Sequence, residues 1–128
     1  MKIVHVIPYF QPKLGYQEFY LAKEQQKMGH EVCVITSDRY APYPDFLRTV
    51  GKILGQRYVG RGTFVEEGLK VVRLPLLFEI ASTVLLLGLR ETLADFAPDV
   101  VHAHGATSPI TMETIVFKDA FHYKTVVD

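Results

Sequence analysis

The feature that constrains this chain most is a strand, a helix and a second strand that follow one another at its start. Residues 3–8 form a nearly continuous β-branched apolar run, which is typical of a parallel strand covered on both faces. Residues 17–28 predict a helix that ends at Gly29, and residues 31–36 repeat the Val/Ile pattern. Such a unit crosses over right-handed and predicts a doubly wound α/β sheet.

The rest of the chain continues this alternation with one interruption. The periodicity fails over residues 37–62, where only residues 45–54 keep a helical pattern. Beyond it we expect a hairpin of residues 63–66 and 69–74, a helix over 82–96, a strand over 99–103, a helix over 109–121 and a strand from 125. The prediction is one Rossmann-like domain over residues 1–128, with a mainly parallel sheet and a β-hairpin excursion.

Composition excludes several classes of function. Fourteen basic and fourteen acidic side chains cancel, so we expect no nucleic-acid partner. The single cysteine, Cys33, allows neither an intrachain disulfide nor a thiolate metal cluster, which favours a cytoplasmic setting. We expect no secretory signal at the start. The longest apolar segment, residues 76–89, contains Glu79 and is shorter than the roughly 20 residues that cross a bilayer.

The loop after the first predicted strand is one candidate binding segment. Ligands of open parallel sheets bind outside the carboxyl ends of the strands. Gly15 precedes a helix whose free N–H groups and dipole favour an anion such as phosphate. In the alternative interpretation, Gly15 only supplies a turn with positive φ. The loop lacks the further glycines of the dinucleotide fingerprint.

A second candidate is His102-Ala103-His104-Gly105, at the end of a predicted strand. Residues two apart on a strand share a face, so both imidazoles should point the same way. Two histidines without a carboxylate at ligand spacing do not make a zinc site, and we expect no metal. Either His104 faces a substrate, or His102 is a buried hydrogen-bonded residue and His104 an ordinary loop residue. His5 is interpreted as a hydrogen-bonded core histidine.

Five segments in this order resemble the N-terminal domain of retaining family 4 (group 1) glycosyltransferases, which have the GT-B architecture. They are residues 1–10, the pattern Pro12-x-x-Gly15-x-x-Glu18, and residues 29–36, 68–75 and 98–105. The resemblance covers nearly the whole chain. Tyr16 stands where the family usually carries a second glycine.

The resemblance implies a two-domain retaining hexosyltransferase without a cofactor. Its C-terminal half binds a nucleotide-diphosphate sugar, and its N-terminal half binds the acceptor, a saccharide or a lipid-linked molecule. Gly15 and Tyr16 are expected at the donor diphosphate, and Tyr9, Glu18, His104 and Gly105 in the acceptor cleft. The catalytic histidine is expected just beyond Asp128. Residues 1–128 would then be an acceptor-side domain, incomplete at its C-terminal end and inactive alone.

Two alternatives remain open at this point. The chain could be a stand-alone module of flavodoxin-like topology that binds a phosphate-bearing ligand without chemistry. It could also belong to a sugar-nucleotide epimerase of the same two-domain architecture.

The interruption carries a hypothesis about membranes. A helix over residues 45–54 would place apolar residues on one face and basic residues at its border, as in helices that dock on anionic lipid. The apolar residues are Phe46, Leu47, Val50, Ile53 and Leu54, and the basic ones are Arg48, Lys52, Arg57 and Arg61. Phe46, Arg48 and Lys52 would then contact the inner face of the cell membrane. Alternatively, the apolar residues cover the sheet and the charges are solvated.

Overall fold

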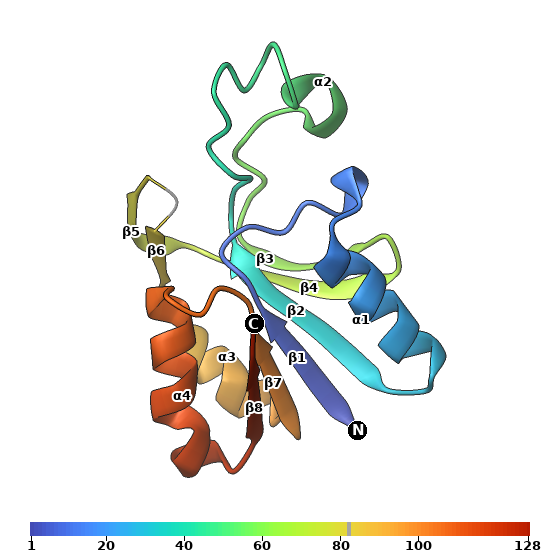
Figure 1. Ribbon diagram of the computed structural model, residues 1–128, viewed down its shortest axis with the longest axis vertical. Helices are drawn as coiled ribbons and strands as arrows, with labels where there is room; N and C mark the ends of the chain where they lie inside the picture. The colour runs from blue at the N-terminus through green and yellow to red at the C-terminus, as the bar shows by residue number, and fades with distance from the viewer. Residues whose placement is uncertain (82) are drawn as a thin grey trace.

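The computed structural model describes residues 1–81 and 83–128, and a central β-sheet organises them (Figure 1). Within these residues the sheet has six strands, in the order β3-β4-β2-β1-β7-β8. Their bounds are β1 Lys2–Val6, β2 Glu31–Ser37, β3 Gly62–Glu66, β4 Leu69–Leu74, β7 Val100–Ala103 and β8 Lys124–Val127. All neighbours pair in parallel except β3, which forms an antiparallel hairpin with β4. The predicted mainly parallel sheet and its hairpin are confirmed.

The order of the parallel strands identifies the topology. The parallel strands can be numbered one to five along the chain, as β1, β2, β4, β7 and β8. Their order across the sheet is then 3-2-1-4-5. This is the Rossmann order, whereas a flavodoxin-like sheet places the second strand at the edge and the third beside the first. The flavodoxin-like topology of the first alternative is therefore wrong.

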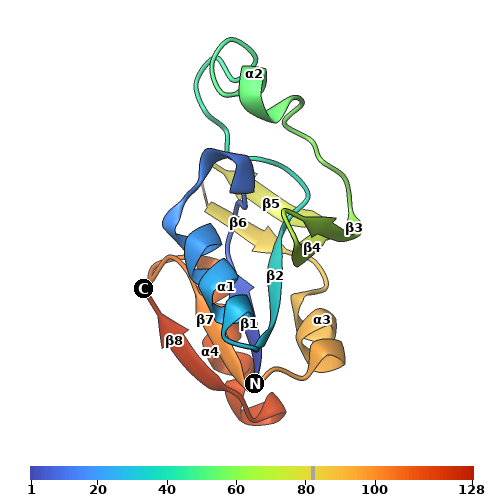
Figure 2. The same ribbon diagram turned by 90° about the vertical axis from the view of Figure 1, so that its right-hand side faces the viewer.

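Helices cover both faces of the sheet, as the continuous apolar strands require. Helix α1 (Gln17–Lys27) follows the one-turn 3-10 helix η1 (Pro12–Leu14) and lies on one face. Helices α3 (Leu89–Phe96) and α4 (Pro109–Phe121) lie on the other face (Figure 2). The predicted helices over residues 17–28 and 109–121 are confirmed.

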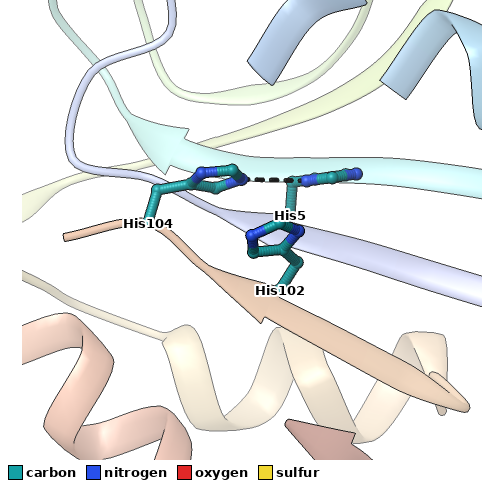
Figure 3. Close-up of side chains that lie close together, drawn as sticks. All are labelled: His5, His102 and His104. Carbon is teal, nitrogen blue, oxygen red and sulfur yellow. Dashed lines mark hydrogen bonds between the residues drawn. The ribbon is translucent and has the colours of Figure 1, made fainter. Parts of the chain in front are cut away.

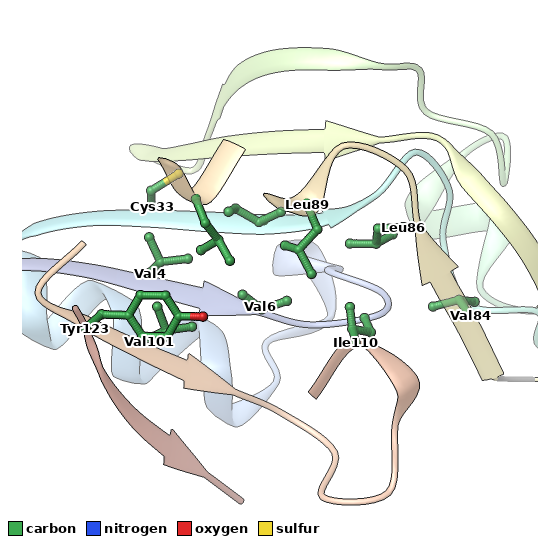
Figure 4. Close-up of a cluster of buried hydrophobic side chains, with 11 residues drawn as sticks. Val4, Val6, Cys33, Val84, Leu86, Leu89, Val101, Ile110 and Tyr123 are labelled. Carbon is green, nitrogen blue, oxygen red and sulfur yellow. The ribbon is translucent and has the colours of Figure 1, made fainter. Parts of the chain in front are cut away.

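The core is split between these faces by the alternation of side chains along β1. Val4 and Val6 point towards α3 and α4, where they join a cluster with Leu93 and Ile110 (Figure 4). Ile3 and Ile7 point to the opposite face and pack with Ala22 of α1 and its neighbours. Both clusters are almost free of solvent, so the sheet is held from both sides.

The predicted helix over residues 82–96 is wrong in its first half. Strands β5 (Leu76–Ile80) and β6 (Thr83–Leu86) form a separate antiparallel pair, and Ser82 lies outside the described residues. Val84 and Leu86 are buried while Thr83 is exposed, which is the period of a strand. Helix α3 begins only after Gly88, whose φ of +87° ends the extended segment.

The predicted helix over residues 45–54 is also wrong. Only the single turn α2 (Gly51–Leu54) is helical, and turns precede it. Leu54 is buried whereas Leu47 and Ile53 are exposed, so the apolar residues do not share one lipid-facing side. Asp45 has a φ of +48°, which is incompatible with a helix starting there.

The membrane hypothesis thus loses its helix. Arg48 and Lys52 are exposed and Phe46 is half-buried, and their contact with lipid stays a prediction. No helix among the described residues has both the length and the apolar character needed to cross a bilayer.

Candidate functional site

A cavity of about 610 Å³ lies at the carboxyl ends of β1 and β7. The chain turns from one half of the sheet to the other between these two strands, because β2 and β4 lie on one side of β1 and β7 and β8 on the other. Such a switch point is where open α/β sheets bind their ligands. The lining residues are Ile7, Pro8, Tyr9, Gln11, Tyr16, Gln17, Glu18, Leu21, Ala41, His104, Gly105 and Asp128.

The structure brings together five of the six residues that the sequence singled out for binding. Tyr9, Tyr16, Glu18, His104 and Gly105 all line this cavity, although they come from two distant segments of the chain. Their roles towards an acceptor or a donor stay predictions.

Gly15, the sixth of these residues, is not part of the lining. It has a φ of +70° and ends η1, with its N–H donating to the carbonyl of Pro12. A β-carbon there would also lie 2.8 Å from the hydroxyl oxygen of Tyr20. The turn alternative therefore accounts for this glycine. Its contact with a donor diphosphate stays a prediction.

The N-terminus of α1 forms one wall of the cavity. Tyr16 is its N-cap residue and offers no side-chain hydrogen bond to the helix, and Gln17 and Glu18 occupy the first turn. The Tyr16 hydroxyl shares a hydrogen bond with the Tyr43 hydroxyl, which together with burial raises the pKa of Tyr16 to about 12. Besides the Glu18 side chain, the peptide N–H groups of Gln17 and Glu18 therefore remain as polar groups that this wall can offer a ligand.

Tyr9 forms another part of the wall, and a carboxylate from the β5–β6 hairpin holds it. Its hydroxyl donates to Glu79, which also accepts from Arg57 and lies 3.7 Å from Arg39. Burial opposes ionisation of Glu79, but the hydrogen bonds from Tyr9 and Arg57 outweigh it and keep the pKa of this carboxyl below its usual value. Burial and the neighbouring carboxylate raise the pKa of Tyr9, so the phenol stays neutral and can donate.

Three histidines meet at the end of the cavity (Figure 3). His5 on β1 pairs in register with His102 on β7, so their side chains emerge on the same face of the sheet. His104 lies two residues beyond His102 and shares that face, as the sequence predicts. The His102 and His104 rings stack with centroids 4.2 Å apart. One ring nitrogen from each of the three histidines lies within 4.8 Å of the other two.

Hydrogen bonds link these histidines to two further residues. His5 Nδ1 lies 3.0 Å from His104 Nε2, and His5 Nε2 lies 2.6 Å from Gln25 Oε1 on α1. Asp128 follows β8 and contacts both His102 and His104. Its Oδ2 lies 3.0 Å from His102 Nε2, and its Oδ1 lies 3.1 Å from His104 Nδ1. His5 is 1% exposed, so its interpretation as a hydrogen-bonded core histidine is confirmed.

Burial dominates the protonation of this cluster. It lowers the pKa of His104 to about 4, with His102 and His5 acting in the same direction and Asp128 opposing them. Burial also lowers the pKa of His5, against its hydrogen bond to the Gln25 amide oxygen, which raises it. Both imidazoles are therefore neutral at pH 7 and can act as hydrogen-bond partners or as ligands.

The sequence did not indicate that His5, Gln25 and Asp128 belong to one constellation with the two histidines. The signal that could have found His5 and Asp128 is the register of three parallel strands. His5 pairs with His102, His102 pairs with Val126, and Asp128 lies two residues beyond Val126 on the same face.

The site combines hydroxyl, carboxylate and imidazole groups around an open cavity at the end of a sheet. Such groups recognise hydroxyl-rich ligands by hydrogen bonds, and the uncapped helix N-terminus favours a negative group beside them. Comparison with protein families matches residues 19–120 to the glycosyl transferase 4-like domain. The chain belongs to this family. No curated protein sequence matched the chain.

The family fits the topology described above. A glycosyl transferase 4-like domain with a mostly parallel, Rossmann-like sheet is what the sequence resemblance implied, and that part of the resemblance is confirmed. The protein to which the domain belongs is accordingly a glycosyltransferase family member.

Proposed function

We propose that this domain is the acceptor side of an enzyme that moves a hexose from a nucleotide-diphosphate sugar to a hydroxyl group, with retention at the anomeric carbon. The cavity at the switch point carries the proposal, because hydrogen-bonding groups from both halves of the sheet converge there. Glu18 reaches it from the start of α1, and His104 and Asp128 reach it from the ends of β7 and β8. The donor sugar would be bound by a second domain of the same parent chain.

Glu18 and His104 suit a hydroxyl-bearing acceptor for different reasons. A carboxylate accepts hydrogen bonds from sugar hydroxyls, and a neutral imidazole can either accept or donate. Gly105, with a φ of +98°, allows the backbone to come close to a ligand beside His104. Tyr16 and the first turn of α1 lie at the mouth of the same cavity, where a diphosphate group could approach the peptide N–H groups.

Steady-state kinetics of the full parent enzyme tests this proposal. Glu18→Gln should raise the KM for the acceptor about ten- to hundredfold, the range expected from hydrogen bonds that involve a charged group. His104→Ala removes a neutral partner and should raise this KM about two- to tenfold. The KM for the nucleotide-sugar should change little. Glu24→Gln, an exposed carboxylate on the same helix, is the matched control.

Two outcomes would contradict the proposal. Effects of Glu18→Gln and His104→Ala confined to the KM of the nucleotide-sugar would place these residues on the donor side. Product analysis that found an epimerised nucleotide-sugar and no glycosylated acceptor would favour the epimerase alternative.

A further inference from the structure

We propose that His5, His102 and His104 form a binding site for one divalent transition-metal ion, with zinc as the best-fitting ion. The expectation of no metal rested on a pair of histidines without further ligands. The parallel register adds His5 to that pair, and the three rings offer nitrogens within 4.8 Å of one another. Three protein ligands beside an open cavity are the arrangement of zinc sites that keep one coordination position free.

We call the ring nitrogens that face Gln25 or Asp128 the outer nitrogens. Their contacts determine which nitrogen of each ring carries the hydrogen. Each of them faces an oxygen: Gln25 Oε1 for His5, Asp128 Oδ1 for His104 and Asp128 Oδ2 for His102. Carboxylate and amide oxygens only accept hydrogen bonds, so with this orientation of the Gln25 amide the facing nitrogens are the donors. Histidines that bind metals usually donate their other ring N–H to a carboxylate or carbonyl oxygen in this way.

In this arrangement the other nitrogen of each ring, the inner nitrogen, carries no hydrogen and keeps its lone pair. His5 Nδ1 and His104 Nε2 are then two lone pairs that face each other over 3.0 Å. They repel unless a positive charge lies between them, and either a proton or a metal ion can supply that charge. Rotation of the Gln25 amide, so that its NH₂ group donates to His5, is the neutral alternative.

The spacing is close to that of a tetrahedral site. A Zn–N distance of about 2.0–2.1 Å places the ligand nitrogens ~3.3 Å apart. His5 Nδ1 and His104 Nε2 already lie 3.0 Å apart, and each of the three rings offers a nitrogen within 4.8 Å of the others. Ring rotations that move the nitrogens by about 1–2 Å therefore complete the set. Imidazole nitrogens select zinc, copper or nickel over magnesium and calcium, which prefer oxygen ligands.

The cavity gives the ion a route to the site. His104 and Asp128 line it, while the His102 and His104 side chains are 12% and 14% exposed. A water molecule or the hydroxyl of a bound ligand could therefore take the fourth coordination position. Asp128 would act as a positioning residue, since both its oxygens hold the outer nitrogens of ligand rings.

Calorimetric titration of tag-free protein with Zn²⁺, after treatment with EDTA, tests the site, and Co²⁺ absorption in the visible range reports the coordination geometry. We expect one ion per chain and no competition by Mg²⁺. His102→Asn and His104→Asn should each weaken zinc binding at least a hundredfold, and Asp128→Asn about ten- to hundredfold. Gln25→Glu should preserve binding, because a carboxylate can only accept the hydrogen from His5.

His122→Asn is the matched control. His122 lies at the end of α4 with a φ of +58°, a conformation that asparagine tolerates, and it precedes β8 at the end opposite to Asp128. Thermal unfolding by circular dichroism confirms that each variant is folded. The proposal is overturned if the unmodified chain binds no stoichiometric zinc, or if His102→Asn or His104→Asn leaves the affinity unchanged.

Discussion

Strands β1 and β7 present different kinds of side chain on their two faces. Towards α3 and α4 they present Val4, Val6 and Val101, all at most 1% exposed and packed in an apolar cluster. Towards the α1 side, where Ile3 packs in the second apolar cluster, the same two strands also present His5 and His102, which reach Gln25 and Asp128 through hydrogen bonds. Alternation along a strand thus lets adjacent residues serve stability and chemistry separately.

The largest effect on stability should follow from creating a cavity in the core between the sheet and helices α3 and α4. Leu93 of α3 is fully buried in the cluster that covers Val4 and Val6. Leu93→Ala should lower the free energy of unfolding by about 2–5 kcal/mol, because the lost apolar contacts leave a cavity. Urea unfolding followed by circular dichroism measures this. Leu77→Ala, at an exposed position of the β5–β6 hairpin, should cost less than about 0.5 kcal/mol, and equal losses would contradict the comparison.

A smaller loss should follow from removing one partner on the polar face. Gln25→Leu leaves His5 Nε2 without an acceptor in a buried environment, which should cost about 1–3 kcal/mol. The same unfolding experiment measures it. Glu24→Leu, one position earlier on α1, changes only an exposed pair with Lys27 and should have little effect. A neutral result for Gln25→Leu would show that the His5 contact contributes nothing to stability.

The smallest of the three effects should appear when the pH falls from 7.5 to 6. The pKa of His104 is lowered to about 4 by burial, with His102 adding to the effect, whereas the unfolded chain has a histidine pKa of about 6.5. The unfolded state therefore takes up the proton first as the pH falls. The free energy of unfolding should decline between about pH 6.5 and pH 4, on the order of 1 kcal/mol at pH 6.

Urea unfolding in EDTA at pH 7.5, 6.0 and 5.0 measures this decline. His104→Asn should make it shallower, because the titrating group is gone while the carboxylates that titrate in the same range remain. The pKa of His5 is lowered too, so part of the slope should persist in the variant. Identical slopes in the two proteins would show that His104 does not titrate differently in the folded state.

Local patterns predicted most of the fold and failed where tertiary contacts decide. The Val/Ile runs of β1 and β2 and the Gly29 that follows α1 are strong signals, and their elements lie where expected. The leucines of residues 84–89 fit a helix and a strand about equally well. Burial of Val84 and Leu86 against α4 and its neighbours decides for a strand there.

The site was predictable to the extent that it depends on strand ends. His104 and Gly105 follow β7, and Tyr9 follows β1, so their convergence comes from the parallel order alone. The contact of His5 with His102 depends on the register between strands almost a hundred residues apart, which no local pattern reports. No sequence pattern distinguishes Gln25 from the other polar residues of its helix. Its contact with His5 appears only when α1 is placed over β1.

Glu79 connects the cavity to a part of the molecule that contributes nothing to its lining among the described residues. The carboxylate lies on the β5–β6 hairpin and fixes the hydroxyl of Tyr9, and through Arg57 it also fixes the segment that follows β2. The orientation of Tyr9 in the cavity wall thus depends on a hairpin that does not line the cavity. Two relatives with identical cavity linings could accept different ligands solely because their hairpins differ, and a comparison restricted to lining residues would overlook the cause.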